Sequence, residues 1–319
     1  MSKIIAVMNQ KGGVGKTTTT VNLGAALAGK SFKVLLVDLD PSGSLSNWLS
    51  NEDGEGFSGL GELVYGRAAA ADIIRKSDVL GLDYIPSGNS LREVLPKGSF
   101  SIYSLTESIR ELKDKYEYII LDCPPSSDFL IGNALIASDS IIIPIQTETL
   151  PLQSAVRFLD WLDNFINTQN RSIDILGILP CMFDSRTRLS NMVLETMKSS
   201  ENLGPLVFDT VIRKNVKLAE IAVSGKSIFK SASGSFGAED YCKLAEEVIE
   251  RTGMTIREPE NEIQTESSDP AVDDADDPVT VGVSSDDISH EAQDPQEEHV
   301  YRQSSYIANA GDNIESGEN

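Results

Sequence analysis

The chain has 319 residues, 40% of them apolar, which is enough to bury the core of one large α/β domain or two ordinary ones. A net charge of −22 would argue against a nucleic-acid partner if it were spread evenly along the chain, but it is not. Residues 258–319 hold 18 acids and one base, a charge of −17, which leaves −5 for residues 1–257. The three cysteines lack C-x-x-C spacing, which argues against a disulfide framework or a zinc knuckle. The sequence contains no run of about 18 apolar residues that could span a membrane, so we expect a cytoplasmic protein.

Short apolar runs alternate with longer helical patterns along most of the chain. The runs are apolar on both faces, as the strands of a parallel sheet covered on both sides must be. We expect strands at residues 4–8, 34–37, 118–121, 140–144 and 175–179. We expect helices at residues 17–28, 103–115, 152–166, 190–198 and 238–252. This alternation predicts an α/β fold with a doubly wound, mostly parallel sheet flanked by helices.

The composition changes sharply after the last helical pattern, near Gly253, so we expect a domain over residues 1–253 and a tail over residues 254–319. Four prolines interrupt the tail: Pro259, Pro270, Pro278 and Pro295. An acidic segment with so few large apolar residues cannot offset its ordering entropy, which predicts disorder. Both histidines, His290 and His299, lie in the tail, so histidine-based catalysis and histidine metal sites are not expected in the domain.

Residues 11–18 read KGGVGKTT and fall between a predicted buried strand and a predicted helix. This is the context of a phosphate-binding loop, whose glycines let backbone N–H groups face phosphate oxygens at the positive end of a helix. In such a loop Lys16 reaches the β- and γ-phosphates and the Thr17 hydroxyl binds Mg²⁺. The usual first glycine is replaced by Gln10, and a second lysine stands beside it at Lys11.

Two aspartates follow predicted strands, Asp40 in VDLDP and Asp122 in LDCPP. The carboxyl ends of parallel strands meet at one edge of a sheet, where magnesium-linked carboxylates belong. We expect Asp122 to bind the metal through water. We expect Asp40 to orient the attacking water and to contact the metal through water. The alternative for either aspartate alone is a helix cap or a turn.

The motifs KGGVGKTT, VDLDP and LDCPPS, in this order and spacing, resemble those of the ParA/Soj partition proteins, P-loop ATPases with a deviant Walker A motif. The similarity continues through NALIASDSIIIPIQTE, MFDSRTRLSNMV, VIRKNVKLAE and GAEDYCKLAEEV, and so covers residues 1–252. It implies slow, partner-stimulated ATP hydrolysis with Mg²⁺, an ATP-sandwich homodimer, and ATP-dependent, non-specific binding to double-stranded DNA. It also implies a ParB-like partner and a location on the nucleoid.

The resemblance gives the two lysines different roles. In that family the lysine at position 11 crosses the dimer interface to the phosphates of the facing subunit's ATP, and the neighbouring Gly12 must be small. Such a cation is available only when two subunits meet, like an arginine finger supplied in trans. The implied catalytic residues are Lys11, Lys16 and Asp40. The implied nucleotide-binding residues are Lys11, Gly12, Gly13, Val14, Gly15, Lys16, Thr17, Thr18 and Asn215.

The resemblance also assigns DNA contacts to Arg186, which follows MFDS, and to Lys217 in NVKLAE. Three further basic residues nearby extend this predicted face: Arg188, Arg213 and Lys214. The alternative is that all of these are ordinary solvated surface charges.

The chain departs from the family pattern in three places. The P-R-N element that contacts the nucleotide reads R-K-N at 213–215, so Asn215 can still bond the adenine edge while the proline is missing. Lys217 keeps the charge of the family's basic position without the bidentate fork of arginine. The basic turn R-S-R-G-A-E reads G-S-F-G-A-E at 234–239, which predicts lower DNA affinity.

The most favoured function is segregation of a plasmid or chromosome with a ParB-like partner. The same ATPase could instead position a protein cargo on the nucleoid. A MinD-like membrane cycle is less favoured, because it needs a basic amphipathic C-terminal helix and this C-terminal segment is acidic and rich in proline, so no membrane partner is expected. The acidic tail either competes with DNA for the basic face or serves solubility alone.

Overall fold

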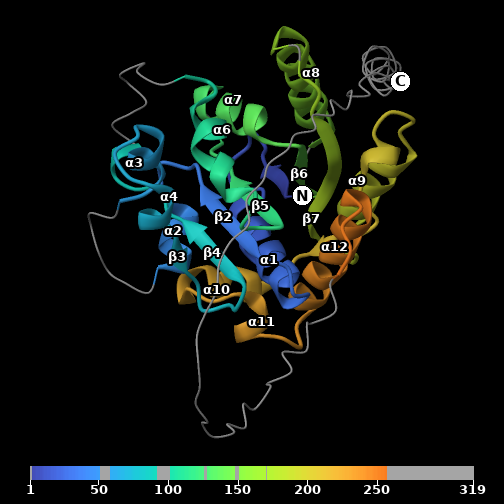
Figure 1. Cartoon of the computed structure of the whole chain (residues 1–319). Helices are drawn as coiled ribbons and strands as arrows, with labels where there is room; N and C mark the ends of the chain where they lie inside the picture. The colour runs from blue at the N-terminus through green and yellow to red at the C-terminus, as the bar shows by residue number, and fades with distance from the viewer. Residues whose placement is uncertain are drawn as a thin grey trace, which may run out of the picture.

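The computed structural model of the chain is shown in Figure 1. It describes residues 2–50, 58–91, 101–125, 128–147, 151–169 and 171–256. The predicted disorder of the acidic tail falls on residues from 257 onward, which lie outside the described residues.

The described strands form one eight-stranded sheet in the order β3-β4-β2-β5-β1-β6-β7-β8. The strands are β1 (Lys3–Val7), β2 (Val34–Asp38), β3 (Arg75–Lys76), β4 (Leu82–Ile85), β5 (Tyr118–Asp122), β6 (Ser140–Gln146), β7 (Asp174–Phe183) and β8 (Ile212–Arg213). All neighbouring pairs are parallel except the short pair of β3 with β4. The predicted mostly parallel sheet is confirmed.

Helices cover both faces of this sheet (Figure 1). One face carries α3 (Leu60–Val64), α4 (Ala70–Ile73), α6 (Ser104–Ile109), α7 (Asp128–Ala137), α8 (Pro151–Gln169) and α9 (Arg188–Ser199). The other carries α1 (Lys16–Gly29), α2 (Ser44–Leu49), α10 (Val216–Ser224), α11 (Ile228–Ser231) and α12 (Phe236–Thr252). Single turns of 3₁₀-helix span Arg110–Leu112 and Gly204–Leu206.

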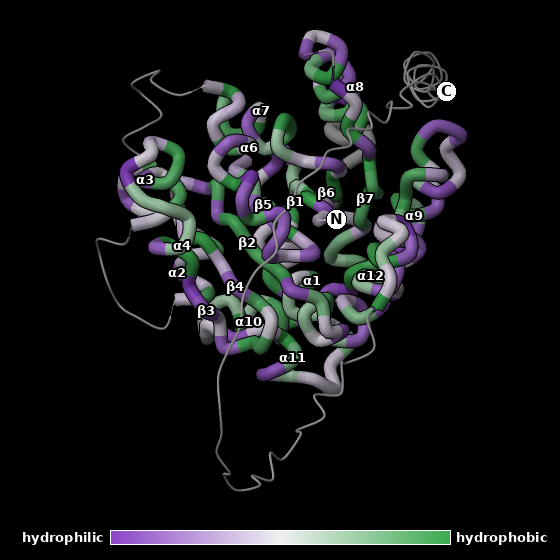
Figure 2. The backbone as a smooth tube through the Cα atoms, viewed as in Figure 1, coloured by the Kyte–Doolittle hydropathy of each residue, from purple (hydrophilic) through white to green (hydrophobic). Residues whose placement is uncertain are grey.

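Strand residues alternate between the two layers of core. In β1, Ile4 and Ala6 pack into one layer while Ile5 and Val7 pack into the other, and all four are fully buried. This explains why the strands read as continuous apolar runs rather than as alternating patterns. In Figure 2 the hydrophobic colour is concentrated along strands such as β2 and β7.

The last helix, α12, is well delimited by its caps. The Ser235 hydroxyl accepts a hydrogen bond from the Ala238 N–H at its start, and Gly253 ends it in the left-handed region at φ 65°. The helix packs along α1 and so supports the helix that follows the phosphate loop. No helix within the described ranges is long and apolar enough to cross a membrane.

Several elements differ from the expectations, which named five strands and five helices; two of them are α6 and β4. The helix predicted at 103–115 is shorter, because α6 ends at Ile109 and a 3₁₀ turn follows. The strand β4, which lies between β3 and β2, was not predicted, since Asp83 interrupts its apolar run. That carboxylate accepts hydrogen bonds from Lys76 Nζ at 2.7 Å and Tyr116 Oη at 2.6 Å, which is how an acidic residue is accommodated in the sheet.

Candidate functional site

The phosphate loop joins the end of β1 to the start of α1. Gly13 and Gly15 adopt φ values of 73° and 97°, a region that side chains other than glycine rarely occupy. Gly12 is exposed, Val14 is buried and Thr18 lies in the first turn of α1. The first N–H groups of α1 have no acceptor within the helix, so this turn presents donors and a positive dipole end to an anion.

Lys16 lies almost completely buried beneath this loop, with 7% of its surface exposed. Its ammonium donates a hydrogen bond to the carbonyl oxygen of Lys11 at 3.1 Å. Burial lowers its pKa, while the nearby charge of Asp122 acts in the opposite direction. Among the described residues, this buried cation donates to a backbone carbonyl, a bond that an incoming anion can replace.

Thr17 and Asp122 are in direct contact. The Thr17 hydroxyl donates to Asp122 Oδ2 at 2.7 Å, and the Thr20 hydroxyl lies 3.4 Å from Oδ1. Burial, followed by the charge of Asp38, raises the pKa of Asp122 well above its usual range. A nearby divalent cation would favour the ionised form, and hydroxyl and carboxylate oxygens are the donors that Mg²⁺ prefers, so these residues fit a magnesium ion. The described residues contain no cluster of three or more His, Cys, Asp or Glu side chains able to hold a metal by themselves.

Asp38, which sequence reasoning missed, lies beside Asp122 in the paired strands β2 and β5. It is fully buried and accepts hydrogen bonds from the Asp40 N–H at 3.0 Å, the Ser46 N–H at 2.8 Å and the Ser46 hydroxyl at 2.5 Å. Burial raises its pKa to about 6. The first aspartate of VDLDP was the available signal. It anchors the loop that carries the predicted Asp40, whose own carboxylate accepts from the Ser42 N–H at 2.8 Å.

Lys11 is exposed and folds back over its own loop. Its ammonium donates to Gln146 Oε1 at 3.1 Å, and Gln146 Nε2 donates to the Gly13 carbonyl at 2.8 Å. Gln146, at the end of β6, was not among the predicted site residues. The sequence gives no local signal for it, because its partners are far away along the chain.

Asn215 caps α10. Its side-chain oxygen accepts from the Lys217 N–H at 2.9 Å, and a Cβ at Gly237 would lie 3.1 Å from its Nδ2. The amide therefore lies against the first turn of α12.

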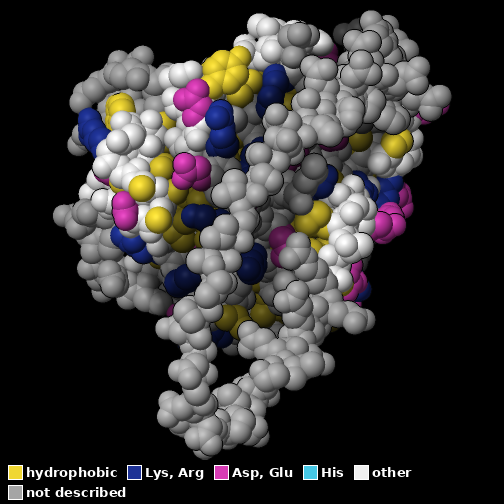
Figure 3. All heavy atoms as spheres, viewed as in Figure 1, with side chains coloured by type: hydrophobic (Ala, Val, Ile, Leu, Met, Phe, Trp, Pro, Cys, Tyr) yellow, Lys and Arg dark blue, Asp and Glu magenta, His cyan; other side chains and the backbone are white. Residues whose placement is uncertain are grey.

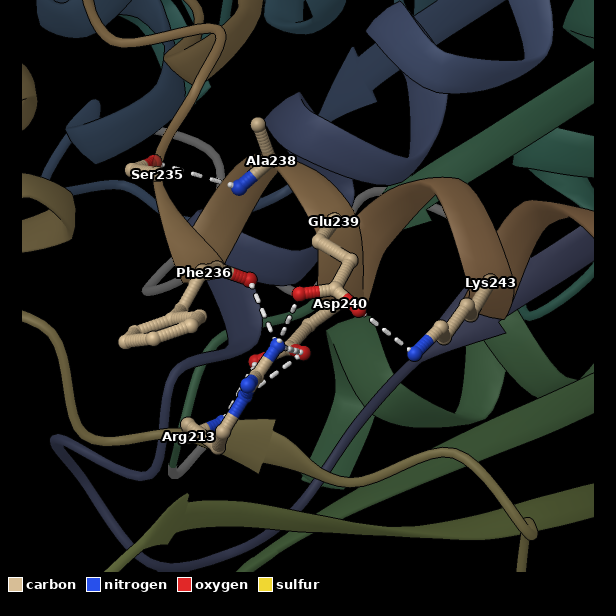
Figure 4. Close-up of polar contacts among 7 residues, drawn as sticks. All are labelled: Arg213, Ser235, Phe236, Ala238, Glu239, Asp240 and Lys243. Atoms are coloured by element: carbon tan, nitrogen blue, oxygen red, sulfur yellow. Dashed lines mark hydrogen bonds and ion pairs between the residues drawn. The ribbon is translucent and has the colours of Figure 1, made fainter.

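Arg213 is held by carboxylates (Figure 4). It bonds Asp240 through Nε and Nη2 and Glu239 through Nη2, and its guanidinium lies 4.3 Å from the centroid of the Phe236 ring. Two acids therefore match the charge of Arg213, and the expectation that it extends a basic face stays a prediction.

Two of the remaining predicted DNA-binding residues, Arg186 and Lys217, also pair with acids. Arg186 is exposed and forms a two-pronged bond with Asp184, at 2.9 and 2.8 Å. Lys217 pairs with Glu220 at 2.8 Å. Arg188 opens α9, and the Lys214 N–H bonds the Phe183 carbonyl at 2.9 Å, which brings the loop after β8 beside the loop after β7. On the face seen in Figure 3, Lys and Arg side chains are likewise interspersed with Asp and Glu.

Comparison with known proteins identifies the family. A family model described as an AAA domain matches residues 2–175. The sporulation initiation inhibitor protein Soj of Bacillus subtilis is 41% identical over 252 residues, covering 78% of this chain and 98% of Soj. The chromosome partitioning protein ParA of Caulobacter vibrioides is 34% identical over 255 residues, covering 78% and 94%. The chain belongs to the ParA/Soj family of P-loop ATPases.

A solved structure supports the P-loop fold of this ParA/Soj chain. Cobyrinic acid a,c-diamide synthase of Mycobacterium smegmatis, with bound ADP and magnesium, matches with a TM-score of 0.65 at 31% identity, over 77% of this chain and 93% of that chain. The resemblance seen in the motifs is thus confirmed across the fold and across most of the sequence.

Proposed function

We propose that this ParA/Soj chain binds ATP with Mg²⁺, closes into a homodimer, binds DNA and drives plasmid or chromosome segregation with a ParB-like partner. The observation that carries the proposal is the meeting of Lys16, Thr17 and Asp122 at the start of α1. One buried cation, one hydroxyl and one carboxylate supply what a magnesium nucleotide requires.

The chain's own residues divide the work of binding. Lys16 leaves the Lys11 carbonyl and neutralises the β- and γ-phosphates, while the N–H groups of the loop hold their oxygens. Thr17 would hold Mg²⁺ directly, and Asp122 would hold it through water, with Asp40 also reached through water. When bound, the ion neutralises phosphate charge that builds up during transfer.

Hydrolysis requires a positioned water. Asp40 follows β2 and is anchored through its N–H to the buried Asp38, so its carboxylate is the group assigned to orient this water. Lys11 of the facing subunit adds the positive charge in trans. Since that lysine is supplied only by a partner, turnover is slow in isolated subunits and rises when a ParB-like protein favours the closed dimer.

DNA binding is assigned to Arg186 and Lys217, with Arg188 and Lys214 beside them. Phosphate oxygens would replace Asp184 and Glu220 as the partners of the first two side chains. Such contacts carry no base readout, which agrees with non-specific binding on the nucleoid.

The test is DNA affinity measured without nucleotide, with ADP and with ATP. We expect binding only with ATP, and its loss in the Arg186→Ala/Lys217→Ala double variant. The matched control is Lys33→Ala/Lys115→Ala, which should bind DNA like the wild type. These two exposed bases precede β2 and β5, at the amino-terminal ends of the strands, whereas Arg186 follows the carboxyl end of β7. Absence of DNA binding in every nucleotide state would refute the DNA-binding part of the proposal.

A further inference from the structure

The Gln146 side chain bonds two residues of the phosphate loop, Lys11 and Gly13. Its side-chain oxygen accepts from the Lys11 ammonium at 3.1 Å, and its side-chain nitrogen donates to the Gly13 carbonyl at 2.8 Å. One amide group thereby contacts both the Lys11 side chain and the Gly13 backbone. Lys11 is the lysine that, by the family resemblance, reaches into a second subunit.

Met182 supports this amide from β7. It has a φ of 56° and is one of two residues other than glycine with positive φ in the part of the chain that the structure describes. It also lies where the register of β7 with β8 shifts, between Cys181 and Phe183. Its sulfur lies 3.2 Å from Gln146 Nε2. A backbone conformation this unfavourable for a side-chain-bearing residue persists only where its surroundings require it, and such positions cluster at functional sites.

The backbone of Lys11 is fixed on both sides. Its N–H donates to Asn9 Oδ1 at 2.9 Å, and its carbonyl accepts from Lys16 Nζ at 3.1 Å. Asn9 is in turn tied to the Pro144 carbonyl at 2.8 Å. When nucleotide draws Lys16 away from this carbonyl, the Asn9 bond still anchors the Lys11 backbone. We therefore expect most of a change in the reach of this lysine to come from its side chain, which contacts Gln146.

We propose that Gln146, supported by Met182, is a positioning residue that holds Lys11 retracted over its own phosphate loop until a second subunit and its nucleotide draw the lysine away. The inference rests on the proposed ATP-dependent dimer. Releasing the Gln146 contact is then part of the free energy of closing the dimer, so the strength of this contact sets the nucleotide concentration at which dimers form.

Two substitutions separate this role from simple support of the loop. Gln146→Glu keeps an acceptor for Lys11 and strengthens it with a charge, but loses the N–H that holds Gly13. Gln146→Ala loses both contacts. Analytical ultracentrifugation measures the concentration of adenylyl imidodiphosphate, with Mg²⁺, at which half of each variant is dimeric. This concentration is divided by the same variant's dissociation constant for ADP, and the resulting ratio is compared between variants.

We expect Gln146→Ala to lower this ratio about three- to tenfold, as the loss of one solvent-accessible hydrogen bond implies, and Gln146→Glu to raise it by a similar factor. Unchanged ratios, or shifts in the same direction, would overturn the inference while leaving the dimer intact, because both variants lose the Gly13 contact. A wild type that forms no dimer would overturn the proposed function together with it. If the alanine variant melts early, Gln146→Met fills the same space without polar atoms and takes its place.

Discussion

At the residue scale, Lys16 is almost completely buried in the phosphate loop, and this burial lowers its pKa. Its ammonium donates to the backbone carbonyl of Lys11, which a phosphate oxygen can replace with a stronger, charge-assisted bond. In the next residue, Thr17, the side-chain hydroxyl donates a hydrogen bond to Asp122. Charge and metal donors are thus in place before nucleotide arrives.

Replacing this cation tests its assignment. Lys16→Ala should weaken binding of ADP with Mg²⁺ by about 100-fold, the upper range for lost hydrogen bonds to a charged group. Titration of a fluorescent ADP measures the loss. Lys30→Ala is the control, since Lys30 lies just beyond the other end of α1 and pairs with the exposed Glu246. Equal affinity of the two variants would contradict the role of Lys16.

The pairing of Arg186 with Asp184 predicts a pH effect. The hydrogen bonds from Arg186 lower the pKa of Asp184 from 3.8 to about 2. The native state therefore prefers the carboxylate, and this contribution to stability is present above the ordinary pKa and is lost as the pH falls toward 2. In Arg186→Ala the pKa of Asp184 should rise toward its ordinary value, as followed by NMR of the side-chain carboxyl. Lys217→Ala should leave it unchanged, and an unshifted pKa in Arg186→Ala would refute the pairing.

The loop residues could be predicted from sequence because Lys16 and Thr17 belong to one short motif whose spacing has a physical reason. Gln146 could not, and Asp38 was missed although it is the first aspartate of VDLDP. Gln146 reaches a residue 133 positions away, and Asp38 meets its neighbour across the sheet only after β2 and β5 have paired. Contacts made by folding leave no local pattern in the chain.

At the element scale, β8 and α12 are joined by Arg213, whose guanidinium lies between Asp240 and the Phe236 ring. Asp240 is 4% exposed as a side chain, so removal of its partner leaves a nearly buried charge. This junction also fixes the start of α10, because Asn215 lies two residues beyond the arginine and beside Gly237. Three elements of the predicted nucleotide-contacting region therefore depend on one ion pair.

Arg213→Ala should lower the free energy of unfolding by about 2 kcal/mol, below the range for fully buried pairs because the arginine is partly exposed. Urea unfolding measures the change. Lys217→Ala, which loses only an exposed pair, should cost about 0.3 kcal/mol. The double variant Arg213→Ala/Asp240→Ala should recover part of the loss, since no charge is left unpaired. An additive double variant would show that the pair itself contributes nothing.

Long strands were predictable as elements because both faces of β1, β5 and β6 are buried, which leaves an unbroken apolar run. The short strands β4 and β8 were not, since each has few residues and a charged side chain, Asp83 in one and Arg213 in the other. Their charges are satisfied by partners from other elements. Short strands of this kind are specified by tertiary contacts rather than by their own pattern.

At the scale of the whole molecule, the charge separates into a nearly balanced body and an acidic C-terminal segment of −17. If the acidic segment competes with DNA, as we propose, it would do so as a tethered polyanion at side chains such as Arg186 and Lys217, which pair with acids in the structure. Removal of residues 258–319 should tighten DNA binding at about 50 mM salt and have little effect at about 200 mM, where screening weakens both contacts. Fluorescence anisotropy with ATP measures this, and equal affinities at low salt would contradict the competition.

The central claim is that this phosphate loop, with its second lysine, makes an ATP-dependent dimer. It is tested most directly by molar mass in solution, measured by light scattering with ADP or with adenylyl imidodiphosphate and Mg²⁺. We expect the wild type to double its mass only with the ATP analogue, and Lys11→Ala to stay monomeric while still binding ADP. A wild type that remains monomeric with the analogue, or a Lys11→Ala variant that dimerises as readily as the wild type, would contradict the account.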